Sequence, residues 1–167
     1  CTMCRTSDDA VGLARWLRCG VDPNTVDVDG DSEPGNKSAP LLYIAARQGH
    51  EGLIDALLQS GADVDQAHTN GWTSLLVAVE EGHLVVAMKL IAAGADVNKA
   101  MTTTGATPLY IAAQNGHLTV VTKLIAAGAD VNKALTTDGA TPLYFAAQNG
   151  HLTVVTKLIA AGALVNK

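Results

Sequence analysis

The chain has 167 residues, a net charge of −5 and an apolar content of 48%, but only 4% of its residues are aromatic. Its uninterrupted apolar runs are far shorter than the ~20 residues that span a bilayer, so we expect no membrane insertion. The acidic balance argues against nucleic acid as a partner. Cys1, Cys4 and Cys19 cluster near the N-terminus and do not read as a disulfide framework, so we expect an intracellular location, cytoplasmic or nuclear.

A period of 33 to 34 residues runs through the chain. The dipeptide Gly-His recurs at 49–50, 82–83, 116–117 and 150–151, and GADV or GALV recurs with the same spacing. Residues 105–133 and 139–167 differ at only two of 29 positions. Such a period predicts an array of stacked units. We divide the chain into five units, about 1–28 (partial), 29–66 with a finger insertion, 67–99, 100–133 and 134–167.

The first two units hold the segments that most resemble chemical motifs. Residues 30–38, GDSEPGNKS, depart from a phosphate-binding loop because Asn36 separates Gly35 from Lys37. The stretch DVDGDSE lacks the glycine and glutamate of a calcium loop at their required positions. Cys1 and Cys4 with the distant Cys19 lack a fourth zinc ligand. We interpret these segments as a solvated acidic finger and packing thiols, and expect no cofactor and no metal.

The fourth unit shows the local pattern most clearly. Thr107 can cap a helix whose first residue is Pro108, and Gly116 can end that helix in a left-handed conformation. A second helix is predicted over 118–127, with its apolar residues on one face: Leu118, Val121, Leu124 and Ile125. The polar segment that follows predicts a turn or hairpin, the finger. Helices this short need neighbouring units to bury their apolar faces, so the fold class is an all-α solenoid.

The repeated unit resembles an ankyrin repeat. The resemblance rests on Thr107-Pro108-Leu109, Ala112-Ala113, Gly116-His117, Val120-Val121 and residues 128–132, and it covers essentially the whole chain. It implies an ankyrin-type α-solenoid of helix-turn-helix units joined by β-hairpin or turn fingers. The sequence departs from the family where the histidine after T-P-L is replaced by Tyr43, Leu76, Tyr110 and Tyr144, and where Ser74 replaces the proline.

Five histidines need an interpretation. His50, His83, His117 and His151 follow the same glycine in each unit, and stacked units lie about 10 Å apart, too far for rigid units to share a zinc ion. We expect these four side chains to cap the second helix and to bond to neighbouring loops. His68 is an isolated finger residue that we expect to be solvated.

The resemblance implies a protein-binding module without catalysis, used on the concave surface of fingers and first helices. No nucleophile and base stand at a recognisable spacing, so we do not expect an enzyme or a small-molecule substrate. Two alternatives remain: a structural spacer array, favoured by the near-identity of the last two units, and the targeting arm of a larger enzyme. Partner identity and oligomeric state cannot be read from the sequence.

The candidate partner-binding residues vary between units while the frame stays fixed. In the first helices and fingers they are Arg47, Gln48, Asn70, Trp72, Glu80, Glu81, Met101, Thr103, Thr104, Gln114, Asn115, Leu135, Thr137, Asp138, Gln148 and Asn149. The acidic pair Glu80-Glu81 predicts a partner with a basic patch against the second and third units. Trp72 has two interpretations, a contact anchor or packing between fingers.

Two further expectations concern modification and the ends of the chain. Asn98 and Asn132 lie in segments that resemble the ankyrin sites accepted by asparaginyl hydroxylases, whereas Asn166 is a poorer match because Leu164 replaces the acid. We also expect the natural protein to continue on both sides. The apolar residues of the last unit that we expect to await a neighbour are Leu143, Phe145, Val155 and Leu158.

Overall fold

The protein is an array of paired antiparallel helices. The computed structural model describes residues 22–24, 26–27 and 39–165, and the first, partial unit lies mainly outside them. The helices are α2 (Leu41–Gln48), α3 (Glu51–Gln59), α4 (Ser74–Glu80), α5 (Leu84–Ala92), α6 (Pro108–Gln114), α7 (Leu118–Ala126), α8 (Pro142–Gln148) and α9 (Leu152–Ala160). In the first finger, β1 (Val26–Asp27) pairs antiparallel with β2 (Ala39–Pro40). The predicted all-helical repeat fold is confirmed.

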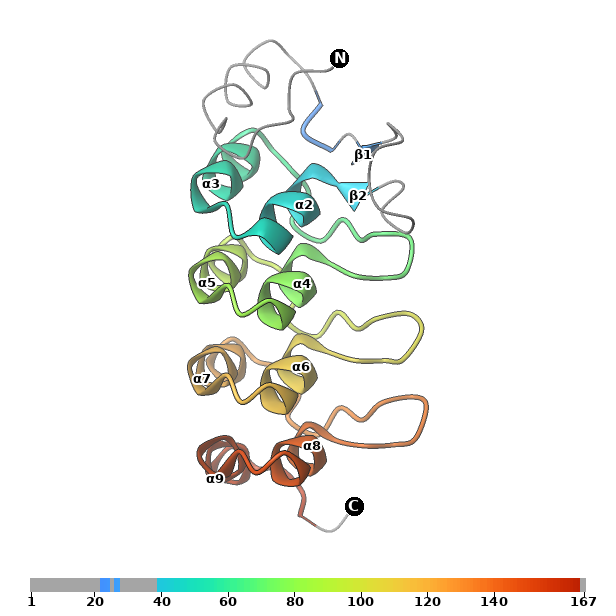
Figure 1. The fold of residues 1–167 in the computed structure, drawn as a ribbon, viewed down its shortest axis with the longest axis vertical. Helices are drawn as coiled ribbons and strands as arrows, with labels where there is room; N and C mark the ends of the chain where they lie inside the picture. Colours follow the sequence, from blue (N-terminus) through green and yellow to red (C-terminus); the bar gives the residue numbers. More distant parts are fainter. Residues whose placement is uncertain (1–21, 25, 28–38, 166–167) are drawn as a thin grey trace.

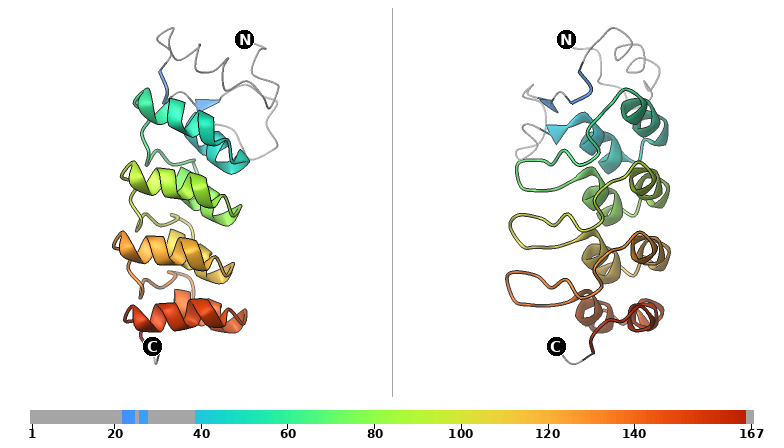
Figure 2. Two further views of the ribbon diagram at one scale, coloured as in Figure 1. Left: turned by 90° about the vertical axis from the view of Figure 1, so that its left-hand side faces the viewer. Right: turned by 180° about the vertical axis from the view of Figure 1, so that it is seen from behind.

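The helix pairs stack into a column with two parallel rows (Figure 1). One row holds the first helix of each pair, α2, α4, α6 and α8, and the other holds the second helices, α3, α5, α7 and α9. The fingers between the pairs project from the first-helix row, away from the second-helix row (Figures 1 and 2). The array therefore has two surfaces of different make-up, one of fingers and first helices and one of second helices.

The first helices begin as the sequence predicts. The Thr107 hydroxyl accepts the backbone N–H of Tyr110 at 3.2 Å, and Pro108 follows as the first helical residue. Thr73 and Thr141 make the same cap on α4 and α8. In α2, Pro40 stands in the place of this threonine and makes no side-chain cap bond.

The core is made by both helix rows and is continuous along the array. Leu57, Leu90, Leu124 and Leu158 occupy the same position of successive second helices, and each is fully buried. The predicted apolar face is correct for Val121 and Leu124, but it is wrong for Leu118, whose residue surface is 38% exposed. Val120, two residues further along α7, is buried in the core instead of Leu118.

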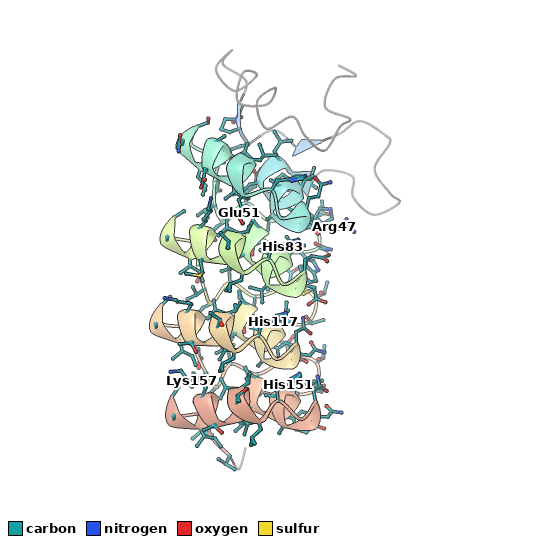
Figure 3. All side chains as sticks on the ribbon, turned by 60° about the vertical axis from the view of Figure 1, so that its left-hand side comes forward. Arg47, Glu51, His83, His117, His151 and Lys157 are labelled. Atoms are coloured by element: carbon teal, nitrogen blue, oxygen red, sulfur yellow. The ribbon has the colours of Figure 1, made fainter. Side chains whose placement is uncertain are left out.

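Two histidines of the Gly-His pairs, His83 and His151, bond their units to the preceding ones. The Nε2–H of His83 donates to the carbonyl oxygen of Arg47 at 3.0 Å, and that of His151 donates to the carbonyl oxygen of Gln114 at 2.9 Å. A methyl group at Gly116, where φ is +75°, would lie 2.7 Å from the His151 ring. Figure 3 shows His83, His117 and His151 one above another along the stack. We expected these side chains to bond to neighbouring loops; His83 and His151 do bond to the neighbouring unit, but their acceptors lie in the last turns of helices α2 and α6.

The predicted helix-capping role of the histidine side chains is wrong. His50, His83, His117 and His151 are the N-cap residues of the second helices, yet none makes a side-chain cap bond among the described residues. The carbonyl oxygens of α2 and α6 in the preceding unit take the ring N–H of His83 and His151 instead. This arrangement satisfies carbonyls that the C-terminal turn of a helix leaves without a partner.

The last helix pair exposes a different set of apolar residues from the one expected. Leu143 and Leu158 are buried, at 8% and 0% exposure, because they pack within their own pair and against the preceding one. Phe145 and Val155 are half-buried and also pack against the core. The exposed apolar side chains of this unit are Tyr144, Leu152, Ile159, Leu164 and Val165.

Candidate functional site

The candidate residues of the first helices form a row along the ends of those helices, which we call the helix-end row. Its members are Arg47, Gln48, Glu80, Glu81, Gln114, Asn115, Gln148 and Asn149, and each pair lies at the C-terminal end of α2, α4, α6 or α8. All are exposed except Gln114, which is half-buried. Neighbouring members contact each other: the Asn149 side chain donates to the carbonyl oxygen of Gln114 at 2.8 Å.

The candidate residues of the fingers form a second row, which we call the finger row. It consists of Asn70, Trp72, Met101, Thr103, Thr104, Leu135, Thr137 and Asp138. Adjacent fingers are bonded together, since the Thr136 backbone N–H donates to the carbonyl oxygen of Thr104 at 3.0 Å. Asn70, Thr103, Thr137 and Asp138 are exposed.

Three apolar members of the finger row are only partly exposed. Trp72, Met101 and Leu135 are half-buried and pack against the hydrophobic core. The packing interpretation of Trp72 therefore describes a large part of its surface. Replacing any of these three side chains would therefore lower the stability of the array.

Tyrosines that the sequence analysis did not select lie between the two rows. Tyr43 stacks on His68 of the next finger, with ring centroids 5.5 Å apart, and lies close enough to Arg47 and Glu81 to feel their charges. Burial raises the pKa of the Tyr43 phenol, the Arg47 guanidinium lowers it, and the Glu81 carboxylate raises it.

The next tyrosine along the array repeats this placement. Burial raises the pKa of Tyr110, and the carboxylate of Asp138, a finger residue, raises it further. The Tyr110 ring meets Phe145 edge-on at 5.1 Å. Tyr144, in the same position of the last unit, is 57% exposed. Tyrosine in place of the expected histidine was the sequence signal that could have found this third row.

His68 does not behave as predicted. Its residue surface is only 6% exposed, so the expectation of a solvated side chain is wrong. Its Nδ1–H donates to the side-chain oxygen of Asn70 at 2.8 Å, and its buried Nε2 has no partner among the described residues. The backbone N–H of His68 bonds to Trp72, just as those of Met101 and Leu135 bond across their own fingers. His68 thus fills a position that is apolar in the later units.

The charge of the surface changes along the array. Arg47 and Glu81 approach to 3.9 Å, with both side chains about half exposed, so this ion pair contributes little to stability. Glu80 is exposed at the end of the same helix. The corresponding residues of the later units are neutral amides, so the negative charge of the helix-end row is confined to α4.

The described residues hold no cluster of three metal-ligating side chains. The candidate phosphate-like and calcium-like segments and the three cysteines lie outside these residues, apart from Asp27 of β1. In the part of the chain that the structure describes, no helix has the length and hydropathy of a membrane span.

Asn98 and Asn132 hold adjacent units together through their side-chain amides. The Asn98 oxygen accepts the Asp130 backbone N–H at 2.8 Å, and its nitrogen donates to the carbonyl oxygen of Gly128 at 3.1 Å. Asn132 makes the same two bonds to Leu164 and Gly162. An enzyme that modifies either residue must therefore compete with contacts between units.

Comparison with protein families gives one finding. The family described as Ankyrin repeats (3 copies) matches residues 3–101 and again residues 86–167. Together the two matches extend from residue 3 to residue 167, essentially the whole chain. No curated protein matches the chain in sequence.

Proposed function

Because this chain belongs to the ankyrin repeat family, whose arrays are generally non-catalytic protein-interaction modules, we propose that it binds a partner protein on the surface of its finger row, helix-end row and intervening tyrosines. Most of these side chains are exposed, although Trp72, Met101 and Leu135 also pack against the core. The bound protein would lie along several units at once, since no closed apolar pocket is needed for such contacts.

The observation that carries this proposal is the change of exposed side chains over a fixed backbone frame. Glu80 and Glu81 stand where the later units have Gln114-Asn115 and Gln148-Asn149. Both glutamates are exposed, and α4 has the same length and the same threonine cap as α6 and α8, so this frame does not itself require acids there. Two adjacent exposed carboxylates favour a partner with a basic patch against α2 and α4.

The test is site-specific photocrosslinking with the full chain. A photoreactive amino acid at Glu80 or Asn115 should capture a partner in extracts of the source cells, because both side chains are exposed in the helix-end row. The matched control places the same group at Ala126, which is exposed on the second-helix row. Capture of the same protein with equal yield from Ala126 would contradict the proposed surface.

The spacer alternative has one observation in its favour, the near-identity of the last two units. A pure spacer needs no specific surface, so none of the photoreactive positions should give a discrete product. The targeting-arm alternative is compatible with the same binding surface and differs only in what is attached to the array. Sequencing the complete gene separates it from the other two.

We also propose that Asn98 and Asn132 are hydroxylation sites, and that they are modified before Asn166. Their bonds to the next unit make transient separation of two units a condition for modification. Mass spectrometry of the protein incubated with an asparaginyl hydroxylase measures the order. Oxygen found first on Asn166 would argue against the assignment.

A further inference from the structure

The outer face of the second helices carries exposed apolar side chains interspersed with threonines, and it carries no acid in its last three units. In α5, α7 and α9, Val85, Met88, Leu118 and Leu152 are 46%, 38%, 38% and 74% exposed. Each of these three helices contains one lysine and no aspartate or glutamate. We call this surface, which lies on the left in Figure 1 and faces the viewer in the left view of Figure 2, the helix-two face.

The junction between α3 and α5 shows what these lysines can bind. The Lys89 ammonium lies 2.6 Å from a carboxylate oxygen of Asp55 and 4.0 Å from one of Glu51, both on α3. Its side chain also donates to the carbonyl oxygen of Glu51 at 3.4 Å. A lysine at this position therefore reaches back one unit, to the first two turns of the preceding second helix.

The same place is apolar or uncharged in the later units. Lys123 and Lys157 occupy the position of Lys89, but Met88 and Thr122 stand where Asp55 stands, and Leu84 and Leu118 stand where Glu51 stands. The packing of α5 on α7 and of α7 on α9 repeats that of α3 on α5. Among the described residues neither Lys123 nor Lys157 forms an ion pair.

We propose that the helix-two face is a second docking surface, for an acidic amphipathic helical segment of a partner protein. Carboxylates of that segment would take the places on Lys123 and Lys157 that Asp55 takes on Lys89. Its apolar side chains would cover Met88 and Leu118, which the repeat places beside those lysines. The site ends at the α3–α5 junction, because Glu51 and Asp55 already neutralise Lys89 there. Figure 3 shows Glu51 on α3 and Lys157 on α9, near the two ends of the array.

This surface is separate from the finger and helix-end rows, so its test does not depend on the function proposed above. The probe is a fluorescent peptide of about 14 residues with leucines at i, i+3, i+4 and i+7 and glutamates elsewhere. The matched peptide has lysine in place of every glutamate. Fluorescence anisotropy with the full chain should show binding of the acidic peptide, weakened by salt, and none of the basic peptide.

The decisive variant returns the missing acids to the array. Met88→Asp with Thr122→Asp recreates the ion pairs of the α3–α5 junction. This variant should keep the fold and weaken binding of the acidic peptide roughly ten-fold or more. Lys123→Gln with Lys157→Gln should have the same effect by removing the charges. The control, Gln148→Ala with Asn149→Ala, changes the helix-end row and should leave binding unchanged.

Four results would overturn the proposal. The first two are no binding of the acidic peptide and equal binding of the acidic and basic peptides. The third is an unchanged affinity of Lys123→Gln with Lys157→Gln for the acidic peptide while circular dichroism shows an intact fold. The fourth is binding of phosphatidylserine vesicles without binding of the acidic peptide. The last result would assign the face to an anionic lipid surface instead. If the acid-restoring variant fails to fold, the lysine variant decides alone.

Discussion

The contact between Gly116 and His151 gives a prediction whose size follows from the structure. Gly116→Ala puts a side chain at φ +75°, which costs about 1–2 kcal/mol for a residue other than glycine. The new methyl group would also meet the His151 ring at 2.7 Å, so the ring must move. Its bond to the carbonyl oxygen of Gln114 is then lost, at about 0.5–1.5 kcal/mol. We expect a total loss of about 1.5–3.5 kcal/mol in the free energy of unfolding.

Gly82 provides the matched control for this prediction. It has the same φ of +75° and the same place in its unit, but the nearest ring atom, on His117, would lie 3.6 Å from the new methyl group. Gly82→Ala should therefore cost only the backbone contribution, about 1–2 kcal/mol. Guanidinium chloride unfolding followed by circular dichroism measures both values, provided that the slopes agree.

A double variant isolates the contact itself. In a His151→Ala background, Gly116→Ala should cost only the backbone contribution, because no ring remains to be displaced. Equal losses for Gly116→Ala and Gly82→Ala would refute the reasoning. So would an unchanged cost of Gly116→Ala after His151 is removed.

Three shorter predictions test other parts of the structure. His68→Met, which copies Met101 of the next finger, removes a buried nitrogen without a partner and should raise the free energy of unfolding by about 1 kcal/mol, measured by guanidinium chloride unfolding. Ser74→Pro, which copies Pro108, should raise it by about 0.5–1 kcal/mol in the same assay, since Thr73 already has the extended conformation that precedes a proline. The phenol of Tyr110 should titrate above pH 10.0, because burial raises its pKa. Titration followed by ultraviolet absorbance should show this high-pH transition, and the transition should be missing in Tyr110→Phe. The stability that the neutral phenol contributes is present below pH 10.0 and is lost as pH rises through the raised pKa.

The sequence could predict the repeat, the helix bounds and the caps because these depend on local chemistry. Thr107, Pro108 and Gly116 act within a few residues of their own position, and the structure places the helix between them as expected. The period then arranges such units without further information. Contacts between units are harder, because they join residues about 34 positions apart whose mutual orientation the period alone does not fix.

Leu118 and His68 are two residues whose exposure the sequence predicted wrongly. Leu118 fits a helical stripe, but the structure buries Val120 and leaves Leu118 exposed. His68 looked solvated because it is polar and lies in a finger, whereas the Tyr43 ring of the preceding unit covers it. Within the candidate site, exposure could be predicted for the ends of the first helices, whereas the tyrosines between the two rows were missed although tyrosine in place of the family's histidine marked them.

The central claim is that the finger and helix-end surface binds a partner protein. Once crosslinking has identified that protein, the most direct measurement is its dissociation constant for Glu80→Lys with Glu81→Lys, compared with the unaltered chain and with Thr119→Lys with Thr153→Lys on the helix-two face. All four positions are exposed, so the fold should be kept in both variants. We predict roughly ten-fold or greater weakening in the glutamate variant alone. An unchanged dissociation constant in that variant, or an equal loss in the threonine variant, would contradict the claim.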